Sequence, residues 1–121
     1  MQVYLLAPKN NKTEKTVVED LTKKIEAIGA VVEFKALESS QIMAVIFDGR
    51  ELSSEDYLTI GRFYQTKLND KSKRLVAYLM GDKKDMPESL KKYFDYIALV
   101  ERNFINYLKE YLFSVHKVIK L

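Results

Sequence analysis

Short apolar runs alternate with amphipathic segments along the chain, and this alternation limits the fold more than any other feature. The apolar runs are residues 2–7, 30–34, 42–47, 74–80 and 96–100. Between the first two runs, apolar side chains recur at four- and three-residue spacing, as at Leu21, Ile25 and Ile28. Short apolar runs are typical of strands, and the wider spacing is typical of one helix face. The chain is therefore predicted to be an α/β domain with a mainly parallel sheet.

The order of the strands follows from the handedness of their connections. Right-handed crossovers favour a three-layer sandwich whose five-stranded, mainly parallel, flavodoxin-like sheet has the order 2-1-3-4-5. Only residues 35–41 join the second and third expected strands, whereas a parallel crossover usually needs about a dozen residues. We therefore expect one or two helical turns there, or a distorted second strand. No linker or repeat divides the chain, so residues 1–121 are predicted to form a single domain.

Two of the amphipathic segments are long enough to be examined face by face. A helix is predicted over residues 54–67, with Ser53 or Ser54 as its N-cap. Its inner face is expected to carry Tyr57, Ile60, Gly61, Tyr64 and Leu68. The last helix carries more apolar side chains than one face can bury, namely Phe104, Tyr111 and Phe113. This excess indicates a partner surface and predicts a homo-oligomer.

Composition and charge exclude several classes of function. The chain has 121 residues, 47% of them hydrophobic and 31% charged, and no cysteine. Thiolate nucleophiles and cysteine-based metal sites are therefore excluded, and His116 is the only histidine, so no metal site is expected. The net charge of +3 comes from 20 basic and 17 acidic residues that are interleaved. This pattern is typical of a solvated surface, so we expect neither nucleic-acid nor membrane binding, and a cytoplasmic location.

The predicted strand order also places a ligand site. In such sheets ligands bind beyond the carboxyl ends of the strands, where the strand order reverses. Here that point lies between the first and third strands, so its lining would come from "LAPKN" at residues 6–10 and "DGRELSSED" at residues 48–56. The helix start at Ser53 and Ser54 would offer backbone N–H groups suited to a phosphate or carboxylate. The alternative is that these serines only cap the helix.

Two familiar sites at this point of the sheet are excluded by single residues. A response-regulator receiver has acidic residues after its first strand, and here Ala7-Pro8-Lys9 occupies that position. A flavodoxin has a Ser/Thr/Gly-rich phosphate loop there. The segment "APKNNKTEKT" has no glycine, which argues against close approach of the backbone to a phosphate. No cofactor is therefore expected.

Two segments carry a resemblance to a known family. They are "VYLLAP" at residues 3–8 and "DGRELSSEDYLTIG" at residues 48–61. The chain resembles the nucleoside 2-deoxyribosyltransferases and their nucleotide N-glycoside hydrolase relatives, which begin with a strand like V-Y-L-A-G-P and carry a pattern close to D-G-R-x-x-D-S-G-T-x-x-E-x-G. The matching residues of the second segment are Asp48, Gly49, Arg50, Ser54 and Gly61. The resemblance implies ligand-binding roles for Tyr4, Ala7, Asp48, Gly49, Arg50, Ser53, Ser54 and Thr59, although Tyr4 also fits a core position.

The departures from the family pattern bear directly on chemistry. In that family a helix glutamate attacks the anomeric carbon and forms a glycosyl-enzyme intermediate, as a carboxylate can. The matching residue here is Thr59, which is uncharged, and Ser53 stands at the position of the acid that helps protonate the leaving base. Glu55 and Asp56 stand where the family has small residues, and either acid lies within one helical turn of Thr59.

Three functions remain open on these residues. The first, which the missing nucleophile and proton donor favour, is a nucleoside 2-deoxyribosyltransferase-like protein that binds a nucleoside or nucleotide with weak or no catalysis. The second is an active N-glycosidase or deoxyribosyltransferase in which Glu55 or Asp56 replaces the nucleophile. The third is a non-enzymatic assembly module. Fold similarity alone would not establish an activity.

Overall fold

The computed structural model describes residues 2–7, 12–34, 37–49, 51–81 and 86–119, apart from the side chains of residues 12–15 and 115–119. His116 and Arg50 therefore fall outside the described side chains. The elements, in chain order, are β1 (Gln2–Leu6), α1 (Lys12–Ala27), β2 (Val31–Glu33), β3 (Ile42–Phe47), α2 (Ser54–Asn69), β4 (Arg74–Leu79), α3 (Glu88–Lys91), β5 (Tyr96–Ala98) and α4 (Glu101–Ile119).

The five strands form one parallel sheet in the predicted order, β2-β1-β3-β4-β5. β1 is paired on one side with β2, where Tyr4 stands opposite Glu33, and on the other side with β3, where Tyr4 stands opposite Met43. β3 is buried at every position, as the continuous apolar run predicts for a strand that is covered on both faces. The flavodoxin-like strand order is thus confirmed.

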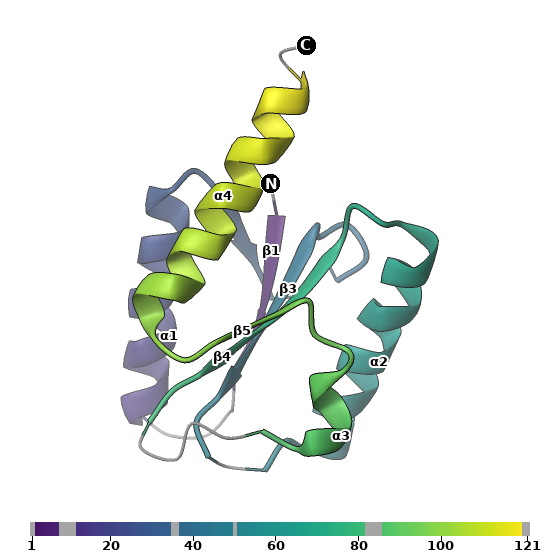
Figure 1. Cartoon of the computed structure of the whole chain (residues 1–121). Coiled ribbons are helices and arrows are strands. Elements are labelled where there is room, and N and C mark those ends of the chain that lie inside the picture. The colour runs from purple at the N-terminus through teal and green to yellow at the C-terminus, as the bar shows by residue number, and fades with distance from the viewer. Residues whose placement is uncertain (1, 8–11, 35–36, 50, 82–85, 120–121) are drawn as a thin grey trace.

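Helices cover both faces of the sheet and enclose two separate cores (Figure 1). α1 and α4 lie on one face, and α2 and α3 lie on the other. Because successive side chains of a strand point to opposite faces, each strand contributes to both cores. Ile42 and Ala44 of β3 pack in the α1–α4 core, which includes Phe104, whereas Met43 and Val45 pack in the α2–α3 core, which includes Phe63.

The connection between β2 and β3 follows a short β2 and contains a tight turn. β2 has only 3 residues, and Ser40 N–H donates to the Leu37 carbonyl at 3.3 Å, which closes a turn before β3 begins. Leu37 is buried in the α2–α3 core. Residues 35–36 lie outside the described part of the chain. Residues 37–41 therefore contain a hydrogen-bonded turn and none of the expected helix.

Lys73 holds this turn against the start of β4. Its side chain is only 7% exposed, and its ammonium group donates to the carbonyl oxygens of Glu38 and Ser40, at 2.7 Å each. The ammonium nitrogen also lies 5.5 Å from the ring centre of Phe63, which is close enough for a cation–π contact. A buried charge needs such partners, so Lys73 ties the turn, β4 and α2 together.

The inner face predicted for α2 is right at Ile60 and wrong at Tyr57, Gly61 and Leu68, which are exposed. The helix itself is confirmed, but its buried residues are Asp56, Ile60 and Phe63. Tyr57 is 39% exposed and Leu68 is 58% exposed. The apolar spacing in the sequence does mark a stripe on this helix. The α2–α3 core, however, is built from a neighbouring stripe.

The predicted apolar excess on the last helix is smaller than the sequence suggested. Phe104 is fully buried and Tyr111 is partly buried against the α1–α4 core. Phe113 is 70% exposed. α4 also continues past the end of the sheet (Figure 1). Of the three aromatic side chains that indicated a partner surface, only Phe113 is therefore left for one.

Replacement of Lys73 by methionine is expected to destabilise the domain by about 2 kcal/mol, because the buried Ser40 carbonyl and the partly buried Glu38 carbonyl lose a charged donor. Urea denaturation monitored by circular dichroism measures this free energy of unfolding. Lys71→Met, at an exposed position in the same loop, is the matched control and is expected to stay within about 0.5 kcal/mol of the parent. Equal stability of the two variants would contradict the role of Lys73.

Candidate functional site

The carboxyl edge of the sheet brings together the segments that the sequence predicts as a site. β1 pairs with β3 up to Leu6 and Val45, so Ala7 and the half-buried Asp48 leave neighbouring strands at the same edge. Gly49 has a φ of +93° and Gly81, after β4, has a φ of +86°. A Cβ at Gly81 would lie 3.7 Å from the backbone oxygen of Asp48. Gly49 and Gly81 thus form left-handed turns that follow β3 and β4 at this edge.

The start of α2 is closed by a capping box. Ser53 is the N-cap, and its hydroxyl oxygen accepts from the Asp56 N–H at 3.1 Å. In return, the Asp56 carboxylate accepts from the Ser53 N–H at 3.3 Å. These reciprocal bonds satisfy two donors that a helix start otherwise leaves open. Ser53 is therefore an N-cap, as one of the two predicted interpretations had it.

Asp56 is held by this box and is not presented to a ligand. Its side chain is 9% exposed and forms part of the buried face of α2. A carboxylate that accepts a backbone hydrogen bond at a helix start stabilises the helix. It also adds negative charge where the helix would otherwise attract an anion. The described geometry thus gives Asp56 a structural role.

Glu55 and Thr59 are joined through the helix backbone. The Thr59 hydroxyl donates to the Glu55 carbonyl oxygen at 3.0 Å, a bond that threonine often makes within helices. The Glu55 side chain is exposed. The carboxylate of Glu55 and the hydroxyl of Thr59 are therefore not arranged as a nucleophile with its base, which requires the two side chains to bond each other.

The remaining predicted residues divide between the two faces of the sheet. Tyr4 is partly buried against the α2–α3 core, whereas Ala7 packs against the α1–α4 core. Tyr4 also lies three residues before Ala7, which places it about 10 Å further from the carboxyl edge of the sheet. Ser54 is exposed at the first position of α2. The structure brings Ala7, Asp48, Gly49, Ser53 and Ser54 to one edge, but Tyr4 stands back from it.

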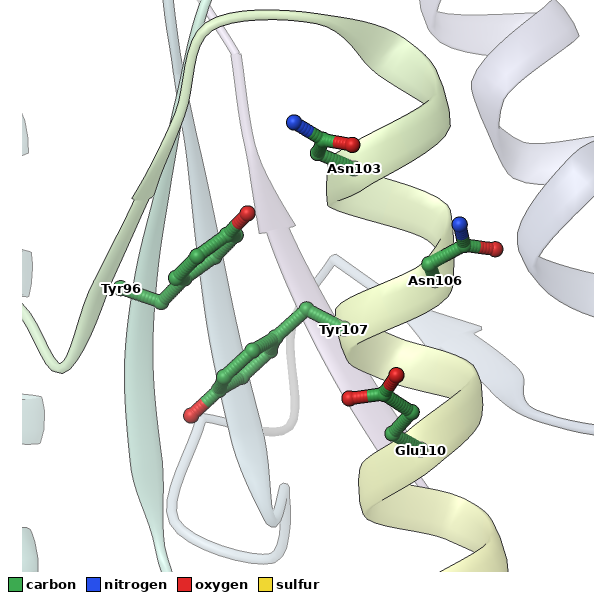
Figure 2. A pocket seen from close by; sticks show the side chains of 5 residues that line it. All are labelled: Tyr96, Asn103, Asn106, Tyr107 and Glu110. Carbon is green, nitrogen blue, oxygen red and sulfur yellow. The ribbon is translucent and has the colours of Figure 1, made fainter.

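A hollow that the sequence did not indicate lies beside the edge strand β5. It has a volume of about 210 Å³ and is lined by Tyr96, Asn103, Asn106, Tyr107 and Glu110. Figure 2 shows Tyr96 reaching in from β5 and the other four side chains from α4. The rings of Tyr96 and Tyr107 are stacked, with centres 4.6 Å apart and planes 3° apart. The hollow contains none of the residues predicted from the sequence.

Burial and neighbouring charges shift the titration of tyrosines near this hollow. Burial raises the pKa of the Tyr107 hydroxyl, and the carboxylate of Asp95 raises it further, against a smaller opposing effect of Arg74. Burial likewise raises the pKa of Tyr111, whose hydroxyl donates to the Ser72 carbonyl. The folded protein thus favours the neutral form of both side chains.

Local spacing in the sequence indicates some structural features that the family resemblance does not. The spacing Ser53-x-x-Asp56 is a capping-box signature, so the role of Asp56 was readable from local pattern alone. Asn103, Asn106 and Glu110 recur at three- and four-residue spacing, which places them on one helix face. No local signal, however, pairs that face with Tyr96.

Neither known protein families nor membrane or metal features identify the function of this chain. No protein-family model matches the chain, and the curated proteins contain no significant match. Within the part of the chain that the structure describes, no helix has both the length and the apolar character needed to cross a membrane. The same part contains no cluster of three or more acidic or histidine side chains that could hold a metal ion.

Removal of the Asp56 carboxylate is expected to weaken the start of α2. Asp56→Ala should lower the free energy of unfolding by about 1 to 2 kcal/mol, because one capping bond and a favourable charge at the helix start are lost. Glu55→Ala, at the neighbouring exposed acid, is the control and should cost no more than about 0.5 kcal/mol. Chemical denaturation measures both, and a larger loss for Glu55→Ala would refute the capping role.

The shifted tyrosines predict loss of stability at alkaline pH. A pKa that is higher in the folded than in the unfolded state stabilises the fold below the ordinary tyrosine pKa of about 10. That contribution disappears as pH rises through the folded-state pKa. Tyr107→Phe should therefore flatten the fall in unfolding free energy above about pH 10. Urea denaturation at a series of pH values measures it, with the more exposed Tyr57→Phe as control. An identical alkaline slope in parent and Tyr107→Phe would disprove the effect.

Proposed function

We propose that this chain is a nucleoside 2-deoxyribosyltransferase-like protein that binds a nucleoside or nucleotide without transferring its sugar. The binding part of this proposal is supported by the position of Ala7, Asp48 and Gly49 at the carboxyl edge of the sheet. β1 and β3 are neighbours there, and the order of strands reverses between them, which is where such sheets hold ligands. A glycine turn after β3 would let a ligand approach the backbone closely.

The hydrogen bonding of α2 is the observation that supports the proposed lack of catalysis. Asp56 uses its carboxylate to cap the helix, and Thr59 uses its hydroxyl to bond the Glu55 carbonyl. A displaced nucleophile would have to reach an anomeric carbon within about an ångström of its productive position. An acid that is held by its own helix start is poorly placed to do so.

The helix start favours a neutral group over a strongly charged one. The N–H groups of Ser54 and Glu55 are donors for which the described residues supply no acceptor, and they are suited to a hydroxyl or a phosphate oxygen. Glu55 and Asp56 both lie in the first turn, however, and their negative charges oppose a phosphate. The test therefore compares nucleosides directly with their monophosphates.

The proposal predicts binding without turnover. Deoxyadenosine, deoxyinosine and their monophosphates should release no base in a chromatographic assay, whereas at least one of them should raise the melting temperature. At a ligand concentration of 100 times Kd, the stabilisation is about 2.7 kcal/mol. Asp48→Ala should remove this shift, and Asp70→Ala, at an exposed position after α2, should retain it.

Two outcomes would replace this proposal with the alternatives. Base release that is abolished by Glu55→Ala or Asp56→Ala would establish a relocated acid and an active enzyme. Absence of both turnover and ligand-dependent stabilisation would leave the assembly module. Thr59→Glu is expected to remain inactive, because Ser53, Glu55 and Asp56 also depart from the family pattern.

A further inference from the structure

The hollow between β5 and α4 has a wall that is polar, acidic and aromatic. Its volume is about 210 Å³, and it is lined by Tyr96, Asn103, Asn106, Tyr107 and Glu110. The two asparagines and the glutamate follow one another along one face of α4, at spacings of three and four residues. Pockets for drug-sized ligands begin at about 300 Å³, so this hollow suits a smaller group.

The polar side chains of this wall are not used by the fold. Within the described part of the chain, no side-chain hydrogen bond or ion pair joins Asn103, Asn106 or Glu110 to another residue. Glu110 is the only charged residue of the lining. A carboxylate beside two amide oxygens is complementary to a cation that carries several N–H groups. An anion would instead be repelled by Glu110.

The stacked tyrosines add an aromatic surface to this wall. The ring centres of Tyr96 and Tyr107 are 4.6 Å apart and their planes are nearly parallel, so no flat group fits between them. In Figure 2 both rings lie toward β5, whereas the amides and the carboxylate follow α4. The face of an aromatic ring attracts a cation, and a guanidinium group, being planar, stacks on it. The hollow therefore offers a ring face and a carboxylate to one ligand.

The chain already places one guanidinium group against a neighbouring tyrosine. The guanidinium carbon of Arg74 lies 5.9 Å from the centre of the Tyr111 ring. Arg74 also donates to two backbone carbonyl groups just before β4, and it does not line the hollow. Its positive charge opposes a second cation nearby. Glu110 lies in the lining itself, so its carboxylate acts on a bound cation at the shorter distance.

From these features we propose that the hollow between β5 and α4 binds a guanidinium group. The N–H groups at its edge donate to the Glu110 carboxylate and to the amide oxygen of Asn106, which is one helical turn away. Its flat face lies on the tyrosine pair where the pair borders the hollow. This site is separate from the carboxyl edge of the sheet and does not depend on nucleoside binding there.

Titration followed by nitrogen–proton correlation NMR tests the site directly. The side-chain amide signals of Asn103 and Asn106 should move on addition of n-butylguanidinium, with a dissociation constant on the order of 1 mM for so small a ligand. n-Butylammonium has the same charge and alkyl chain but no planar fork, so it should bind at least about fivefold more weakly. Equal affinity for the two cations, or amide signals that do not move, would overturn the proposal.

Glu110→Gln tests the role of the carboxylate, because it keeps the shape of the side chain and removes its charge. The dissociation constant for n-butylguanidinium should rise at least about tenfold. Glu19→Gln, at an exposed position of α1, changes the net charge of the protein by the same amount and should leave the constant within about twofold of the parent. A similar loss in both variants would show only general charge attraction and would refute the site.

Two substitutions of Tyr96 separate its ring from its hydroxyl. Tyr96→Phe keeps the stacked ring and should bind n-butylguanidinium within about twofold of the parent, whereas Tyr96→Leu should weaken binding about fivefold. Circular dichroism checks that each variant is folded, and Glu110→Gln decides the case if Tyr96→Leu is not. Equal binding by folded Tyr96→Leu and the parent would contradict the stacked contact.

A blocked arginine identifies the source of the guanidinium group. A free small molecule and an arginine side chain of a partner protein present the same chemistry to the hollow. N-acetyl-arginine-N-methylamide should therefore be titrated alongside n-butylguanidinium. Comparable or tighter binding of the blocked arginine supports a site for a protein side chain, and binding of n-butylguanidinium alone supports a site for a free small molecule. Binding of neither compound would refute the proposal.

Discussion

The buried ammonium group of Lys73 holds the connection on which the sheet order depends. Only residues 34–41 lie between β2 and β3, and within them the chain must cross from one side of β1 to the other. Lys73 fixes the end of this path by donating to the carbonyl groups of Glu38 and Ser40. Because β3 can then begin beside Val3, β1 acquires neighbours on both sides. The reversal of strand order, and with it the candidate ligand site, follows from this pairing.

The start of α2 shows how local helix stability competes with chemistry at such a site. Asp56 closes a capping box with Ser53, and Thr59 bonds a carbonyl of its own helix. Each bond stabilises the helix, and each removes a polar side chain from the groups that could face a ligand. A catalytic carboxylate must instead be left unsatisfied by its own backbone so that it can act on a substrate. In this chain the polar residues of the helix start serve the fold.

α2 has two apolar stripes, and the fold buries one of them. One stripe, with Ile60 and Phe63, is buried under the sheet. The other, with Tyr57, Gly61 and Leu68, is exposed beside it. The hollow between β5 and α4 lies at the outer edge of the sheet, away from both the candidate ligand site and this stripe.

The sequence by itself determined the order of helices and strands, the order of the strands in the sheet and the start of α2. These features depend on local periodicity, on capping residues and on the handedness of crossovers, all of which act over short stretches of chain. The burial of Asp56 and Phe63 in preference to Tyr57 and Leu68 was decided by the tertiary structure. Several stripes of α2 are apolar enough to be buried, and only the position of the sheet selects one. The same holds for Lys73 and for the stacked Tyr96 and Tyr107, because their partners are distant in sequence and meet only after the strands have paired.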